Sequence, residues 1–257
     1  FGIQEDIAQR VVDAFNLTVK QKEQKEKYDA VPLAYDYLLR GRYYFNRCDR
    51  QNSIFARQMF RKTVETDPDY GHAWAWLAYA YAFEYMYFDA SHKNRVQAVR
   101  NSKKALIIAP ELAESHIAAG MCKCIHNECS SAAKSFEEAI KLNPGKFEAW
   151  YFYGRSRIRE GKPQAALKLL QEAAKVQPED FQSLLLQAQL YVSLGDQNSA
   201  LEASKAGIER ARAVLEFYPD DNRAKNLGAL ALQRIGETQE AATWMQDALR
   251  TAPYDPI

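Results

Sequence analysis

Four side chains that can bind a soft metal ion lie within eight residues, in the pattern Cys122-x-Cys124-x-His126-x2-Cys129. Zinc accepts cysteine and histidine ligands, and Cys122 and His126, four residues apart, would share one face of a helix. Cys122 and Cys124 would instead point about 200° apart around a helix, whereas structural zinc sites use Cys-x2-Cys turns in loops. The pattern therefore favours small side chains buried in an ordinary helix, with a metal or redox sensor as the alternative function. We expect no metal and no cofactor.

The rest of the chain shows no pattern typical of a catalytic site. The sequence contains no phosphate-binding loop, no Gly-x-Ser-x-Gly elbow and no zinc-protease motif. Its four histidines have no evident carboxylate partner in sequence, and His116 is expected to pack in the core. We therefore predict that this chain is not an enzyme, even if a longer protein containing it carries a catalytic domain. A regulatory subunit of an enzyme is a second alternative.

Composition restricts the partners and the compartment. The 257 residues are 47% hydrophobic and 26% charged, with a formal net charge of +1, which argues against nucleic acid or an anionic membrane as the main partner. The chain has no stretch of 18 apolar residues and no signal-peptide pattern. Four irregularly spaced cysteines do not resemble a disulfide framework and favour a reducing compartment. We expect a cytoplasmic protein, with the periplasm as the alternative.

Prolines recur at a near-constant interval and give the strongest signal for the architecture. Pro110, Pro144 and Pro178 lie 34 residues apart, and the same step separates Pro219 from Pro253. Five residues before each of them stands an alanine or a valine, as expected near the end of a helix that a proline follows. A fixed period of this size is typical of stacked helix–turn–helix units.

Two segments give the units a recognisable sequence: Trp74-x2-Leu77-Ala78-x2-Tyr81 and Ala132-x3-Phe136-x2-Ala139-x4-Pro144. At these residues the chain resembles the tetratricopeptide repeat (TPR) family, whose 34-residue consensus reads W-x2-L-G-x2-Y, A-x3-F, A and P. The resemblance implies an all-α fold, a right-handed α-solenoid of about six helix–turn–helix repeats preceded by an N-terminal helix. The TPR superhelix would cover residues 35–257, with repeats at about 35–70, 71–112, 113–146, 147–180, 181–221 and 222–255.

The turns inside the repeats support this alignment. Between the two helices of a repeat the backbone must reverse within a few residues, which favours a left-handed conformation. Gly161, Gly195 and Gly236 stand at that position in three repeats. A fourth repeat has Asn127 there, and asparagine is the residue that tolerates this conformation best after glycine. We therefore predict a positive φ at all four positions.

Residues 1–31 are expected to form an amphipathic helix and a charged linker. Apolar residues recur at helical spacing from Ile3 to Val19, and residues 20–27 are all Lys, Glu or Gln. The segment Phe1-x2-Gln4-Glu5-Asp6-Ile7-Ala8 resembles the closing helix of a TolB-like domain. This second resemblance implies that the chain is a fragment of a larger bacterial signalling protein, whose output domain lies outside it.

The resemblance also implies where a ligand binds. In the TPR superhelix the first helix of each repeat lines a concave groove, which suits an extended or helical peptide. Arg155 and Arg159 would pair with a carboxylate of that peptide, and replacing Tyr151 and Arg155 by alanine should abolish binding with little change in melting temperature. The predicted peptide-binding residues are His72, Tyr79, Ile117, Met121, Glu148, Tyr151, Arg155, Arg159, Gln182, Gln189 and Asn226.

Two repeats are longer than the period. The second carries about eight extra residues and a run of aromatic residues, in which Tyr81, Tyr85 and Phe88 follow helical spacing. A first helix longer by about two turns would present these three as one stripe, either for a partner or for packing on the neighbouring repeat. The seven extra residues of the fifth repeat equal about two turns, so its second helix can lengthen without rotating its apolar face.

The last repeat has no visible cap. Solenoids normally end in an element with a polar outer face, yet Trp244 and Met245 add apolar area to the final helix. We expect a second copy of the chain, or another segment, to cover this end. If the chain dimerises there, Trp244→Asp should give a monomer with unchanged helix content.

Overall fold

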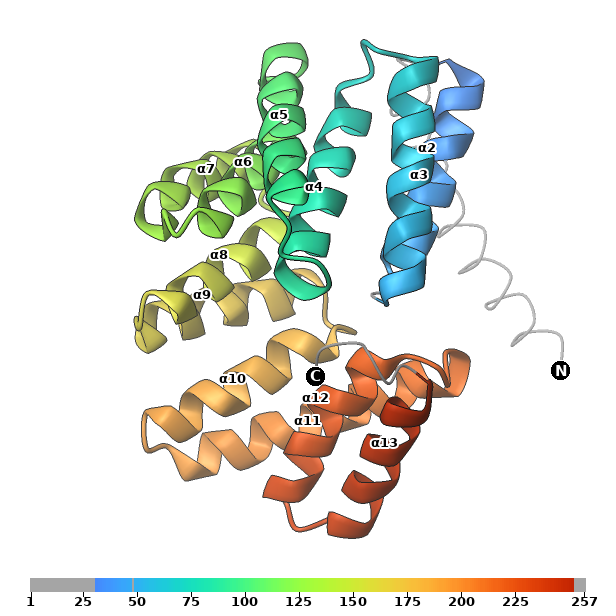
Figure 1. Ribbon diagram of the computed structural model, residues 1–257. Helices are drawn as coiled ribbons and strands as arrows, with labels where there is room; N and C mark the ends of the chain where they lie inside the picture. Colours follow the sequence, from blue (N-terminus) through green and yellow to red (C-terminus); the bar gives the residue numbers. More distant parts are fainter. Residues whose placement is uncertain (1–30, 48, 252–257) are drawn as a thin grey trace, which may run out of the picture.

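The computed structural model describes residues 31–47 and 49–251, which form helices and connecting loops without a strand (Figure 1). The predicted N-terminal helix and the TolB-like segment lie outside these ranges. The helices form six consecutive pairs: α2 (Pro32–Phe45) with α3 (Arg50–Thr66), α4 (Gly71–Tyr87) with α5 (His92–Ile108), α6 (Ala113–Ile125) with α7 (Cys129–Leu142), α8 (Phe147–Arg159) with α9 (Pro163–Val176), α10 (Phe181–Ser193) with α11 (Gln197–Phe217), and α12 (Asn222–Arg234) with α13 (Thr238–Thr251).

The pairs stack in chain order, because the second helix of each pair packs against the first helix of the next. Figure 1 shows that the row of pairs curls round, so that the first pair in blue faces the last pairs in orange and red across the inside of the array. This arrangement confirms the predicted all-α repeat fold. Each pair covers the apolar face that its neighbour cannot bury alone.

All four predicted left-handed residues are confirmed. The φ angle is +60° at Asn127, +69° at Gly161, +81° at Gly195 and +88° at Gly236. No heavy atom lies within 4 Å of a Cβ placed on any of these three glycines. The backbone conformation, rather than lack of space, is therefore what favours glycine at these turns.

Within each pair, a small residue on the first helix lets the second helix come close. A Cβ placed on Gly120 would lie 2.7 Å from two ring carbons of Phe136, and one on Gly154 would lie 2.9 Å from Leu170. Both large side chains are fully buried. The glycine positions in the repeat are thus spacing positions, at which an added methyl group would push the helices apart.

Equivalent side chains join successive pairs. The indole Nε1 of Trp74 donates a hydrogen bond to the carbonyl oxygen of Pro68 at 2.7 Å, and Trp150 donates to Pro144 at 2.8 Å. His116 occupies the same place, with its Nε2 2.6 Å from the carbonyl oxygen six residues earlier. His116 is partly exposed and makes this hydrogen bond, so the prediction of a simple core histidine was wrong.

The two insertions lengthen helices, though not in the same way. Helix α11 has 21 residues against 14 in α9, which confirms the predicted extension of two turns. Helix α4 has 17 residues against 13 in α6, and α5 has 17 against 14 in α7. The prediction of two extra turns in α4 was therefore wrong, because the insertion is shared between both helices of the pair.

The aromatic stripe of α4 packs largely inside the molecule. Tyr81 is 5% exposed, and the guanidinium of Arg57 lies 5.3 Å from its ring centroid. Tyr85 and Phe88 are half-buried against the core of the first four pairs, and Phe88 packs against Phe83. The stripe therefore leaves little area for a partner, and packing is the interpretation that its surroundings favour.

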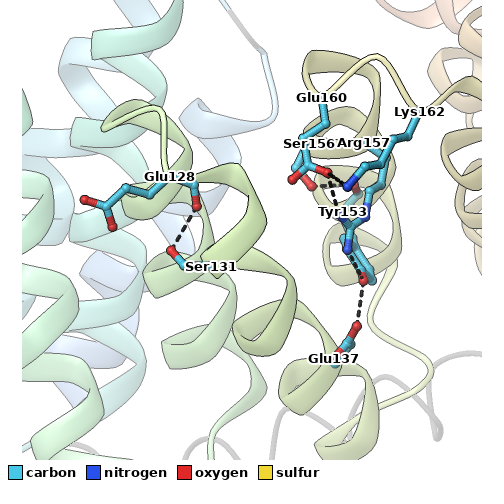
Figure 2. Close-up of polar contacts among 8 residues, drawn as sticks. All are labelled: Glu128, Ser131, Glu137, Tyr153, Ser156, Arg157, Glu160 and Lys162. Carbon is cyan, nitrogen blue, oxygen red and sulfur yellow. Dashed lines mark hydrogen bonds and ion pairs between the residues drawn. The ribbon is translucent and has the colours of Figure 1, made fainter.

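The third and fourth pairs are joined by the polar network shown in Figure 2. The hydroxyl of Tyr153 on α8 donates to Glu137 of α7 at 2.6 Å and accepts from Arg157 at 2.8 Å. Arg157 and Lys162 both pair with Glu160, and these cations lower the pKa of that carboxyl, Lys162 contributing most. The network fixes α8, whose opposite face carries several candidate binding residues.

The last pair of the array carries both apolar residues singled out in the sequence. The ring of Trp244 packs on Gly228 of α12, where an added Cβ would lie 2.3 Å from it. Trp244 and Met245 are both half-buried against the core of the last two pairs. Because Trp244 packs α13 onto α12, we now expect Trp244→Asp to unpack the last pair and to lower the helix content rather than leave it unchanged.

Candidate functional site

A cavity of about 430 Å³ lies on the inner face of the array. Its walls come mainly from the first helices of five pairs, which confirms that these helices face inward. We call it the central cavity. Its lining residues are Arg42, Phe45, Asn46, Trp76, Tyr79, Phe83, Phe147, Glu148, Tyr151, Phe152, Arg155, Gln177, Asp180, Gln182 and Arg223.

Aromatic rings make a continuous wall of this cavity. Ring centroids lie 5.4 Å apart for Trp76 and Tyr79, 5.5 Å for Tyr79 and Phe152, and 5.2 Å for Phe152 and Tyr151. Phe147 stacks on Tyr151 with centroids 5.3 Å apart. Such tilted, edge-to-face and stacked contacts hold the rings in fixed positions, so the wall is preorganised for an apolar group.

Three arginines from distant parts of the chain line this cavity. Arg42 of α2 lies 5.5 Å from the ring centroid of Trp76. The guanidinium groups of Arg155 and Arg223, on α8 and α12, lie 5.1 and 5.3 Å from the ring centroid of the same residue, Tyr87. Tyr87 stands at the end of α4 that the insertion lengthens. The longer helix thus supplies the ring on which two cations converge.

Tyr151 connects three pairs at the edge of the cavity. Its hydroxyl donates to Gln182 Oε1 at 3.0 Å and accepts a hydrogen bond from Arg223 Nη2 at 2.9 Å. The ring is 3% exposed. These two hydrogen bonds link α10 and α12 through Tyr151 of α8 and set the direction of the Arg223 guanidinium.

Tyr79 contributes a buried donor. Its side chain is 2% exposed, and its hydroxyl has no hydrogen-bond partner among the described residues. Burial, with the nearby carboxylates of Glu148 and Glu114, raises its pKa well above the ordinary value of 10. The phenol therefore keeps its proton at neutral pH and offers it to an acceptor.

Two carboxylates partly balance the cations of the cavity. Asp180 caps α10 by accepting from the backbone N–H of Ser183 at 2.7 Å, and burial raises its pKa. Glu148 lies in the first turn of α8 and is half-buried. With three guanidinium groups against these two carboxylates, the lining keeps an excess of positive charge.

A smaller cavity of about 160 Å³ adjoins the central one, and we call it the side cavity. Phe152 and Arg155 line both. Its other walls are mostly apolar and include Met86, Met121 and Leu186. The side cavity therefore offers an apolar recess beside Arg155 to a ligand bound in the central cavity.

The repeats are assigned by comparison with protein families. Two family models, each described as tetratricopeptide repeat, match residues 128–190 and 204–256. The chain carries tetratricopeptide repeats. Such repeats generally act as non-catalytic scaffolds for protein–protein interaction, presenting a concave surface to the partner.

Solved structures share the fold at low sequence identity. A TPR protein of Thermus thermophilus has a TM-score of 0.61 and 17% identity, over 78% of this chain and 99% of that chain. The pilF structure of Pseudomonas aeruginosa has a TM-score of 0.57 and 19% identity, over 86% and 92%. The APC/C hetero-tetramer Cut9–Hcn1 has a TM-score of 0.65 and 18% identity, over 91% of this chain and 42% of that chain. No curated protein matches the sequence.

The predicted peptide-binding residues fall into three groups in the TPR array. Those that line the central cavity are Tyr79, Glu148, Tyr151, Arg155 and Gln182, and those that line the side cavity are Met121, Arg155 and Arg159. Ile117 is fully buried, while the half-buried residues outside both cavities are His72, Gln189 and Asn226.

Two expectations about these residues need correction. Tyr151 is buried and hydrogen-bonded, so replacing it by alanine would also disturb packing and lower the melting temperature. Arg155 and Arg159 were expected to act together. In the structure Arg155 instead shares the Tyr87 ring with Arg223, and Arg159 donates a hydrogen bond to Asn127 at 3.0 Å. Applying the groove positions to the first repeat would have found Arg42, but nothing in the sequence places Tyr87 beside two arginines.

The cysteine cluster gives no support to the sensor alternative. Cys122, Cys124 and Cys129 are buried, and burial raises the pKa of both Cys122 and Cys124 to about 12. Protonated thiols are poor metal ligands and poor nucleophiles. His126 Nδ1 lies 2.9 Å from the carbonyl oxygen of Cys122, and no three metal-binding side chains converge in residues 31–47 and 49–251.

None of the described helices has both the length and the apolar character needed to cross a membrane.

Proposed function

We propose that the TPR array binds a peptide or protein segment in the central cavity and so acts as an interaction module. The observation that carries this proposal is that Arg42, Arg155 and Arg223 all line one cavity with an aromatic wall. These residues belong to three helix pairs that contact one another little, so packing alone does not require their convergence. A volume of about 430 Å³ is within the range of ligand sites and suits one or two side chains of a bound segment.

The chemistry of the lining favours an acidic residue next to a large apolar one. A carboxylate between Arg155 and Arg223 would receive charge-assisted hydrogen bonds, which are stronger than neutral ones. The buried hydroxyl of Tyr79 adds a neutral donor. An aromatic or aliphatic side chain of the same segment would fill the side cavity beside Phe152.

Selection from a random-peptide phage library would test the proposal directly. With the wild-type chain as bait, we expect enrichment of peptides in which Asp or Glu lies within two residues of an aromatic or aliphatic residue. The double variant Arg155→Met/Arg223→Met should lose this preference, while Lys168→Met, an exposed change on α9 outside both cavities, should retain it. Enrichment of peptides without acidic residues by the wild type, or enrichment of the same acidic peptides by the double variant, would contradict the proposal.

The setting of the module follows from the N-terminal resemblance. The TolB-like segment at residues 1–8 supports a place in a larger bacterial signalling protein, in which the array senses or recruits a partner. Sequencing the complete gene tests this, since the proposal expects an output domain to be encoded upstream of this chain. A homodimer through α13 remains a separate prediction, for which Leu249, 47% exposed, is the surface residue to replace by lysine in a light-scattering experiment.

A further inference from the structure

The first pair touches a loop that lies 173 residues further along the chain. Arg47, in the loop between α2 and α3, has its Nη1 3.4 Å from Asp220 Oδ2, in the loop between α11 and α12. The Arg47 guanidinium also lies 5.4 Å from the ring centroids of both Tyr43 and Tyr218. Repeats of a solenoid normally contact only their neighbours, so this contact closes the array on itself, between the blue first pair and the orange helices of Figure 1.

The closing contact adjoins the central cavity. Asn46 lines the central cavity and also a separate cavity of about 270 Å³ that remains around Arg47 and Asp220. The first pair contributes Arg42 and Phe45 to the central cavity. Movement of the first pair away from residue 220 would therefore withdraw one of the three arginines and widen the mouth of the site.

The contact is built to be reversible. The side chains of Arg47 and Asp220 are 29% and 64% exposed, and the space around them is not filled. An exposed ion pair and an exposed cation–π contact each favour the closed form by a factor of about two to five. Together the two contacts across the gap favour it by about four- to 25-fold, and salt weakens the ionic part.

We propose that Arg47 is a latch that closes the array around the central cavity and controls the access of its ligand. Closure itself is independent of any ligand, whereas the control of access rests on the proposed binding function. In the closed array Arg42 completes the basic lining. In the open array the first pair swings out on its packing with α4, and a segment can reach the aromatic wall.

The latch can be tested by pulsed electron spin resonance between labels at two exposed positions, Gln51 and Glu216. The labels are carried on encoded unnatural amino acids, so that the cysteines stay unmodified. We expect one short distance between the labels in the wild-type chain at low salt, and a broader distribution at longer distances in Arg47→Glu. The ratio of closed to open molecules should fall at least fourfold in this variant. The reversed pair Arg47→Glu/Asp220→Arg should restore most of the short distance.

Arg61→Glu is the matched control, because it reverses an exposed charge paired with Glu65 on the same helix without touching the latch. It should leave the distances unchanged, and all variants should keep the wild-type circular dichroism. Identical distance distributions in the wild type and in Arg47→Glu would overturn the latch. So would a wild-type distribution that does not change when the salt concentration rises from about 0.05 to 0.5 M. Neither measurement involves a ligand, so a failed peptide selection would leave this result intact.

Control of access has its own readout. A peptide obtained from the phage selection should associate with Arg47→Glu several-fold faster than with the wild type in stopped-flow fluorescence. Equal association rates for both proteins, with the distances changed as expected, would show that the latch closes the array without controlling the site.

Discussion

The ion pair between Lys146 and Glu114 provides the sharpest test of how the concave face is held. Lys146 Nζ lies 2.5 Å from Glu114 Oε1, and the two side chains are 17% and 10% exposed. Burial alone would raise the pKa of Glu114, but Lys146 outweighs burial and, with His72, lowers it. Burial likewise acts to lower the pKa of Lys146, and the carboxylates of Glu148 and Glu114 raise it instead.

Lys146→Met would leave the Glu114 carboxylate buried without its main partner. Loss of one member of a buried pair costs about 3–5 kcal/mol of unfolding free energy. Replacing both residues by methionine should recover most of that loss, because two apolar side chains need no compensation. Lys141→Met is the control, since Lys141 pairs with Glu138 at 76% and 40% exposure and its loss should cost less than about 1 kcal/mol.

The pH dependence has a definite sign. Because the folded protein lowers the pKa of Glu114, the contribution of the pair is present at neutral pH and is lost as the pH falls through that lowered value. In Lys146→Met burial dominates and should raise this pKa, so the variant gains stability as the pH falls. Urea unfolding should therefore show the difference between wild type and variant narrowing from pH 7 to pH 4.5. A constant difference, or one no larger than that of Lys141→Met, would refute the reasoning.

Three substitutions test the repeat geometry by urea unfolding. Gly120→Ala should lower the free energy of unfolding by about 1–2 kcal/mol, because the clash of the added Cβ with the Phe136 ring costs more than the better helix propensity of alanine gains. Adding Phe136→Leu should recover part of this loss. Full stability of the single variant would show that the two helices can separate to accommodate the methyl group. Gly161→Ala should lower the free energy of unfolding by about 1 kcal/mol, because alanine is strained at the φ of +69°. Unchanged stability of this variant would exclude backbone strain as the reason for glycine at this turn. Trp150→Phe should lose about 1 kcal/mol with the hydrogen bond to Pro144, unless water replaces it.

Much of the fold follows from local chemistry that a sequence displays. Proline removes a backbone donor and a left-handed turn excludes most side chains, so the prolines, Gly161, Gly195, Gly236 and Asn127 mark helix ends one by one. The two-turn lengthening of α11 was predictable because it keeps the helix in phase. The insertion in the second repeat was not, because its residues can join either helix of the pair and only packing decides between them.

The site was predictable in part. Positional rules of the repeat found Tyr79, Glu148 and Arg155, since these depend only on the helical phase within one repeat. Contacts between distant repeats depend on the curvature of the whole array, to which every interface contributes. The meeting of Arg155 and Arg223 at Tyr87, and the contact of Arg47 with Asp220, are of this kind and leave no local signal.

Isothermal titration of one selected peptide tests the central claim most directly. Hydrogen bonds to charged groups contribute about 1.5–3 kcal/mol each, so loss of both guanidinium groups in Arg155→Met/Arg223→Met should weaken the Kd by about 100-fold or more. Lys168→Met should bind as the wild type does, and both variants should keep the wild-type helix content. Equal Kd values for the wild type and the double variant would contradict the claim that the TPR array binds its partner in the central cavity.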